Sequence, residues 1–116
     1  MYTQLKNDIL GKQYSLSIAY VSEKKSREIN KKYRGKDKAT NVLSFPLRKN
    51  EGELVLCKAV IKKEALGRRP MGEAKNSNKI FKEWLGFLVI HGLLHLKGLE
   101  HGKRMEKLEK GYCKRL

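Results

Sequence analysis

The chain has 116 residues and a net charge of +15, from 27 Lys and Arg against 12 Asp and Glu. This length excludes two separate domains, because it supports a single modest core. The charge excludes a preference for cationic partners and favours polyanions, nucleic acid above all, although the same lysines also keep a small protein soluble.

The basic residues are spread along the chain. The first fifty residues contain 12 Lys or Arg and 4 Asp or Glu, and the remainder contains 15 and 8. Cys57 and Cys113 are too few and too scattered for a disulfide framework, so we expect reduced thiols. No cationic and apolar leader opens the sequence, and its longest apolar run, 84–96, is too short for a bilayer. The expected location is the cytoplasm.

The chain begins with a weak helical pattern over residues 1–10 that Gly11 ends. Large apolar side chains then alternate with Ser or Ala over residues 14–20. This period of two predicts a strand.

A helix follows over residues 23–34. Ser22 is suited to cap its first turn, and Gly35 is suited to close it. Ile29 and Tyr33 are expected to form a thin buried stripe while the lysines face water.

A hairpin is predicted next, after the polar loop 35–40. Residues 41–45 indicate a strand that Pro46 stops, and residues 53–57 indicate a second strand after a short turn at 49–52. Three helices are predicted in the rest of the chain: at residues 59–66, from about 76–78 through the apolar run, and at 103–115. A basic break at 68–72 separates the first two. The last helix has Met105, Leu108 and Tyr112 as its apolar contacts. The pattern predicts one α+β domain over residues 1–116, in which a small mixed sheet is flanked by helices and one central helix is buried.

All three histidines of the chain lie at the end of this central helix. His91 and His95 are four residues apart, so they project from the same helical face. Gly98 is placed to reverse the chain and to bring His101 toward them. Three imidazoles with no fourth protein ligand are typical of a catalytic zinc site that keeps an open position, whereas structural sites usually use four ligands, often cysteines.

Two alternatives stand beside this interpretation. A single histidine on an apolar helix is more often a hydrogen-bonded core residue than a ligand. The spacing H-x3-H-x2-G-x2-H also matches an extended metalloprotease motif, in which a Glu after the first His is the general base. Gly92 occupies that position and cannot accept a proton, which weakens the peptidase hypothesis.

Three segments carry a family resemblance: HGLLHLKGLEH at 91–101, YRGKDKATNVLSFP at 33–46 and GELVLC at 52–57. They resemble the signatures of the YbeY family of bacterial rRNA maturation factors, which are zinc-dependent single-strand endoribonucleases. The resemblance implies a small mixed sheet flanked by helices and a zinc ion held by His91, His95 and His101. It also implies a role in rRNA maturation, including 16S rRNA 3′-end processing, and in ribosome quality control at the small ribosomal subunit.

The chain departs from the family pattern in a few places. Glu100 stands where the family usually has Asp, and Glu53 stands where it has Asp in its GD strand. Both changes keep the carboxylate. The connection between Pro46 and Gly52 is short for the family, and so is the C-terminal tail, so we carry over no contact of the family that those segments make.

By the resemblance, Arg34 is the functional arginine of the YRG segment. A guanidinium stabilises charge that develops on phosphate oxygens during cleavage, although an arginine at a helix end also interacts well with the helix dipole. Glu100 is the second candidate catalytic residue, either orienting a ligand imidazole or moving a proton.

Four cations are candidates for holding the RNA backbone, each with a solvated surface as its alternative role: Lys36, Lys38, Arg68 and Arg69. We expect single-stranded RNA and the small ribosomal subunit as partners, no membrane, no small-molecule cofactor and a monomeric chain. Two further functions remain open. One is a non-catalytic RNA-binding assembly factor with a structural zinc, and the less favoured one is a metallopeptidase.

Overall fold

The computed structural model describes residues 2–68 and 77–114. Its elements in chain order are α1 (Thr3–Leu10), β1 (Ser15–Tyr20), α2 (Glu23–Arg34), β2 (Val42–Arg48), β3 (Glu51–Leu56), α3 (Lys58–Gly67), α4 (Ser77–Leu96) and α5 (Lys103–Cys113). The predicted α+β class is confirmed, and every predicted element is present with shifts of a few residues at its ends.

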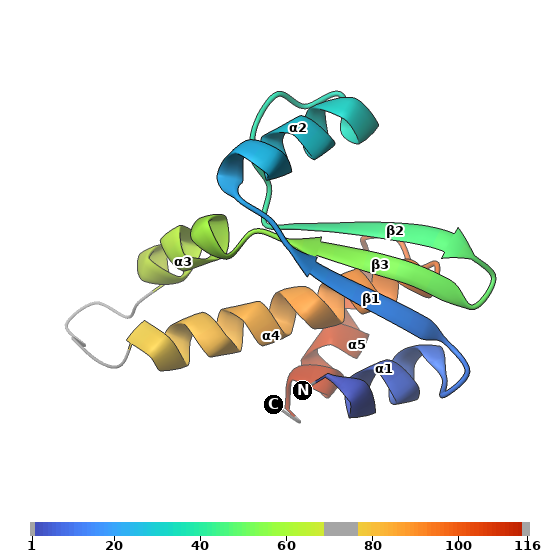
Figure 1. The fold of residues 1–116 in the computed structure, drawn as a ribbon. Helices are drawn as coiled ribbons and strands as arrows, with labels where there is room; N and C mark the ends of the chain where they lie inside the picture. The colour runs from blue at the N-terminus through green and yellow to red at the C-terminus, as the bar shows by residue number, and fades with distance from the viewer. Residues whose placement is uncertain (1, 69–76, 115–116) are drawn as a thin grey trace.

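The sheet is mixed, with strand order β1-β3-β2. β1 pairs with β3 in parallel, and β2 pairs with β3 antiparallel through the predicted hairpin. Helix α4 crosses one face of the sheet, α1 and α5 pack against α4 on the side away from the strands, and α2 stands beyond the opposite face (Figure 1).

The core lies between α4 and the sheet. Leu54 and Leu56 of β3 and Val89, Ile90 and Leu93 of α4 are all fully buried. A helix apolar on nearly every side suits this position, because strands cover one face of α4 and other helices cover the rest. The prediction of a central buried helix is therefore confirmed.

Helix α2 corrects one prediction. Tyr33 is 60% exposed instead of buried. The buried side chains of α2 are Ser26 and Asn30, which bond to the backbone of the following loop at Thr40 and Lys38. Because these two positions of α2 face the backbone of the loop, they are polar groups that hydrogen-bond to it, and only Asn30 Oδ1 is without a partner among the buried polar side-chain atoms of the described residues.

Strand β2 corrects a second prediction. It continues through Pro46 to Arg48, with a register irregularity between these two residues. Since β2 lies at the edge of the sheet, a residue without an N–H is tolerated there. Lys49 and Asn50 form the tight turn to β3.

The predicted helix ends are confirmed by their hydrogen bonds. The Ser22 hydroxyl accepts from the Lys25 N–H at 3.1 Å, and Gly35 closes α2 with φ of +70°. Both cysteines are free thiols. Within residues 2–68 and 77–114, no helix combines the length and the hydropathy that a bilayer crossing requires.

Candidate metal centre and its cleft

His91 and His95 project from one face of α4, and their Nε2 atoms lie 3.0 Å apart. The helix ends at Leu96, and Gly98 adopts φ of +103°. The Leu99 N–H bonds to the Leu94 carbonyl at 3.1 Å, which closes the reversal predicted at Gly98.

The reversal brings the third histidine to the pair. The ring centroid of His101 lies 5.0 Å from that of His91 and 4.7 Å from that of His95. The three residues offer one nitrogen each within 4.8 Å of one another. His101 is exposed, while His91 and His95 are half-buried, so the cluster opens to solvent on the His101 side.

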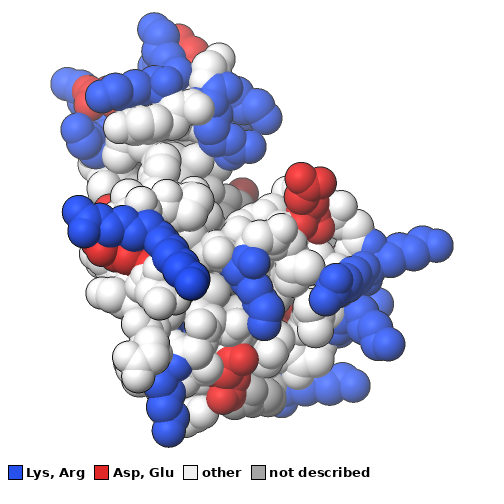
Figure 2. Space-filling view, turned by 90° about the vertical axis from the view of Figure 1, so that its right-hand side faces the viewer, with Lys and Arg blue, Asp and Glu red and all other residues white. Residues whose placement is uncertain are grey.

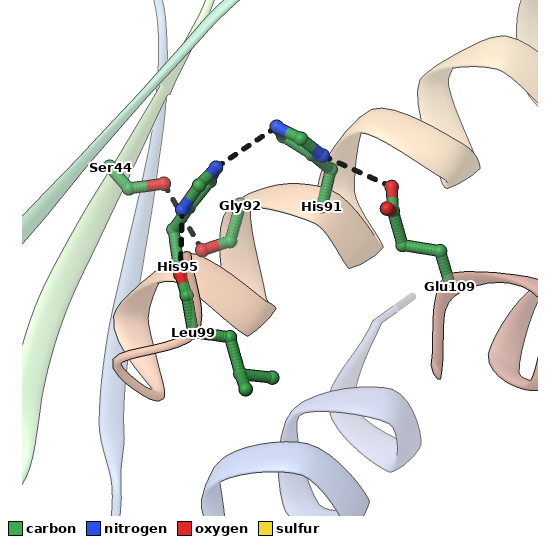
Figure 3. Close-up of polar contacts among 6 residues, drawn as sticks. All are labelled: Ser44, His91, Gly92, His95, Leu99 and Glu109. Carbon is green, nitrogen blue, oxygen red and sulfur yellow. Dashed lines mark hydrogen bonds and ion pairs between the residues drawn. The ribbon is translucent and has the colours of Figure 1, made fainter. Parts of the chain in front are cut away.

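Two acceptors fix the tautomers of the helical pair (Figure 3). His91 Nδ1 lies 3.0 Å from a carboxylate oxygen of Glu109, and His95 Nδ1 lies 3.1 Å from the Leu99 carbonyl oxygen. Both partners only accept hydrogen bonds, so each Nδ1 carries the proton and donates it. The two Nε2 atoms are then left with their lone pairs directed at one another.

This arrangement fits a metal ion. Two bare lone pairs 3.0 Å apart repel each other unless a proton or a cation lies between them. Two nitrogens bound to a tetrahedral zinc, each at about 2.0–2.1 Å, are separated by roughly 3.3 Å. The separation of His91 and His95 is close to this value. The donor set of three imidazoles and no cysteine suits an open rather than a closed site.

Burial, together with a smaller electrostatic effect of the neighbouring His91 ring, holds the pKa of His95 below its usual value. The hydrogen bond to the Leu99 carbonyl acts in the opposite direction but is the smaller effect. At neutral pH His95 is therefore neutral, which is the form that binds a metal ion.

The three histidines line a cleft of about 560 Å³ between α4 and β2. Arg34, at the C-terminal end of α2, lines the same cleft. The structure thus brings the predicted arginine and the predicted metal ligands to one cavity, although they are more than fifty residues apart in sequence. The remaining lining residues come from Thr40 to Ser44, Pro46, Trp84, Phe87 and Leu88.

One wall of the cleft is a rigid aromatic stack. The rings of Trp84 and Phe87 on α4 are nearly parallel, with centroids 5.1 Å apart. The guanidinium of Arg68, the residue that follows α3, lies 4.0 Å from the Trp84 ring centroid. The Trp84 indole N–H donates to a Glu64 carboxylate oxygen at 3.1 Å. Sequence patterns alone gave no role to this pair of rings.

Glu109 is the site residue that the sequence analysis missed. It lies on α5, is only 7% exposed, and contacts His91. Glu100, predicted as a candidate for orienting an imidazole, is exposed and does not line the cleft. The available signal was the position of Glu109 four residues after Met105, on the apolar side of the predicted helix.

Of the predicted RNA-binding cations, the three that the structure describes do not line the cleft. Lys36 and Lys38 are exposed on the loop after α2, and Arg68 is exposed at the end of α3. Arg69 lies outside the described residues. The structure does not test the role of any of the four.

Comparisons with known proteins point to one family. The sequence profile of the family described as Endoribonuclease YbeY matches residues 1–116. The Endoribonuclease YbeY of Chromobacterium violaceum is 38% identical over 125 positions, covering 97% of this chain and 68% of that protein. That of Colwellia psychrerythraea is 38% identical over 106 positions, covering 85% and 63%.

A solved structure is also similar. The solution structure of TM1509 from Thermotoga maritima superimposes with a TM-score of 0.62 at 30% sequence identity, covering 96% of this chain and 76% of that one. The chain spans between 57% and 68% of the length of the curated relatives it matches. With the family profile matched along the whole sequence and the three histidines in one cluster, this chain belongs to the YbeY endoribonuclease family.

Proposed function

We propose that this protein is a zinc-dependent endoribonuclease that hydrolyses phosphodiester bonds of single-stranded RNA in the cytoplasm. Its substrates are rRNA precursors at the small ribosomal subunit, including the 3′ end of 16S rRNA, and rRNA in ribosome quality control. The observation that carries this proposal is that Arg34 and the three histidines line one cleft in a chain of the YbeY family.

The protein groups around the histidines prepare them as ligands. Glu109 and the Leu99 carbonyl hold the Nδ1 protons of His91 and His95, so that both Nε2 lone pairs face the same point. A carboxylate behind an imidazole also raises the basicity of the ligand nitrogen. When bound there, a zinc ion supplies Lewis-acid chemistry and makes water a nucleophile at neutral pH.

Arg34 supplies positive charge to the cleft that the histidines line. Hydrolysis of a phosphodiester increases the negative charge on the non-bridging oxygens, and a guanidinium donates two parallel hydrogen bonds to such oxygens. We assign Arg34 to stabilising this charge in the transition state.

Among the residues that the structure describes, those that line the cleft include no carboxylate. We therefore assign no protein general base to the proposed reaction. Gly92 stands where a metallopeptidase would have its glutamate base. A Cβ there would lie 2.7 Å from Leu54 Cδ2 and 3.2 Å from the Ser44 hydroxyl oxygen, so a glutamate would not fit without a shift of these side chains. The metallopeptidase hypothesis therefore stays without its base.

The test is RNA cleavage by Arg34 variants. Arg34→Ala should keep its metal and bind single-stranded RNA within a small factor of the parent. It should cleave ~10²-fold more slowly, as expected for the loss of one transition-state donor. Arg34→Lys should recover part of the rate, because an ammonium keeps the charge without the planar two-point contact.

Arg48→Ala is the matched control, since Arg48 is exposed on β2 and does not line the cleft. It should cleave like the parent. Equal rates for Arg34→Ala and the parent would remove Arg34 from the mechanism. A parent protein that carries metal, binds RNA and cleaves none would favour the assembly-factor function instead.

A further inference from the structure

The cations of α2 form a stripe that leads into the cleft. Lys24, Arg27, Lys31 and Arg34 are spaced i, i+3, i+7 and i+10 in this helix, so they share one helical face. Arg34 ends the stripe and lines the cleft. From Lys24 to Arg34 the stripe runs about 15 Å along the helix axis, with one cation roughly every 5 Å.

The segment that carries the stripe has a higher net positive charge per residue than the chain as a whole. Residues 23–38 contain eight Lys or Arg and three Asp or Glu. In Figure 2, Lys and Arg side chains gather over α2 at the top of the molecule, and others gather on the right-hand side below it. All four stripe cations are exposed.

Each of the three acidic residues of this segment contacts a lysine or an arginine. Glu23 pairs with Lys63 of α3 at 2.8 Å, and Glu28 lies 3.8 Å from Lys25. Asp37 accepts from Arg27 at 2.7 and 3.1 Å, which fastens the loop to the helix. Asp37 neutralises one of the four positive charges of the stripe, which therefore keeps a net positive charge.

The stripe is also held in place. Both buried residues of α2 bond to the loop backbone: the Ser26 hydroxyl donates to the Thr40 carbonyl at 2.8 Å, and the Asn30 amide donates to the Lys38 carbonyl at 2.8 Å. The same loop leads into β2, whose residues line the cleft. Stripe and cleft are thus parts of one connected surface.

We infer that the α2 stripe binds the phosphodiester backbone of the RNA strand where it leaves the cleft, so that the protein acts on extended single strands longer than the cleft itself. This inference rests on the proposed function. A polyanion is a suitable ligand because the stripe is a row of cations at regular intervals along the helix axis, which can pair with successive phosphates. Single-stranded RNA is favoured over an anionic membrane because the row ends inside the cleft at Arg34, whereas a flat bilayer does not enter a cleft.

The test compares two double variants that lose the same charge. Lys24→Gln with Lys31→Gln removes half of the stripe, and Lys107→Gln with Lys110→Gln removes two exposed lysines of α5, across the sheet from α2. Binding of oligouridylates of about 6 and about 20 nucleotides is measured by fluorescence anisotropy over a range of salt concentrations, with a chelator present to prevent cleavage.

The α2 variant should bind the long strand about fivefold more weakly, and its log–log salt slope should be less steep by about 1.4, because each phosphate contact on a single strand contributes about 0.7. Its binding of the short strand should stay within about twofold of the parent. The α5 variant should match the parent on the long strand more closely than the α2 variant does.

Equal losses for the two variants, or equal losses on both strand lengths, would overturn the stripe while leaving the proposed function intact. So would vesicles of phosphatidylglycerol that bind the parent but not the α2 variant while RNA binding is unchanged. A parent that neither binds the short strand nor cleaves RNA would overturn the proposed function itself, and the stripe with it.

Discussion

At the level of single residues, the contact between Glu109 and His91 shows how the site is prepared. Glu109 is nearly buried, and its contact with His91 Nδ1 is 3.0 Å. A buried carboxylate is costly without a partner, so its retention on the apolar side of α5 indicates a specific role. Orienting His91 is the role that its position supports.

We predict that Glu109→Gln keeps the fold and lowers metal affinity by roughly 10–100-fold. The glutamine is the same size and still accepts a hydrogen bond, so the substitution removes mainly the charge behind the imidazole. Affinity is measured by competition with a chromophoric chelator. Glu106→Gln, on the exposed side of the same helix, is the control and should bind metal like the parent.

A Glu109→Gln protein with undiminished affinity would show that the carboxylate serves packing alone. This residue also marks the limit of sequence reasoning. The histidine ligands could be predicted because helical spacing and Gly98 determine where they point. Glu109 comes from another helix, and its approach to His91 depends on how α5 packs against α4, which no local pattern encodes.

At the level of elements, Gly92 sets how closely α4 approaches the sheet. A Cβ at this position would lie 2.7 Å from Leu54 Cδ2 and 3.2 Å from the Ser44 hydroxyl oxygen. The same Ser44 hydroxyl donates to the Gly92 carbonyl at 3.1 Å. The glycine therefore lets helix and strands touch directly below the metal centre.

We predict that Gly92→Ala destabilises the protein by about 1–2 kcal/mol. Overpacking against the fully buried Leu54 costs about 1–3 kcal/mol, and the gain in helix propensity of up to ~1 kcal/mol offsets only part of it. The free energy of unfolding is measured by urea denaturation. Gly111→Ala in α5, where no atom lies within 4 Å of the added Cβ, should instead stabilise by roughly 0.5–1 kcal/mol.

Destabilisation by both substitutions, or by neither, would contradict the packing argument. The elements themselves were largely predictable, since the strands, the hairpin and the helix caps depend on local periodicity and turn residues. The errors arose where tertiary context decides. Tyr33 is exposed because α2 packs on a polar loop, and β2 passes through Pro46 because it is an edge strand.

At the level of the whole molecule, the core is independent of the metal centre. The fully buried residues between α4 and β3, such as Leu54 and Leu93, touch one another without any metal ligand among them. We therefore expect the metal-free protein to be folded, unlike small domains whose zinc replaces a core. A chain that unfolds on chelation would favour a structural zinc and the assembly-factor function.

The last prediction follows from this independence. Zinc that binds only the folded protein stabilises it by about 2.7 kcal/mol at a free concentration 100 times its Kd, which for a domain of this size raises Tm by roughly 10 °C. His101→Ala should lose most of this rise while its metal-free Tm stays near that of the parent, because His101 is exposed and lies outside the core. Thermal denaturation followed by circular dichroism, with zinc and with chelator, measures both quantities. If His101→Ala keeps the full rise in Tm, then His101 is not a ligand and the ion is held by α4 alone. If instead the metal-free Tm of His101→Ala is lower than that of the parent, the reversal at Gly98 supports the fold in a way that burial does not indicate.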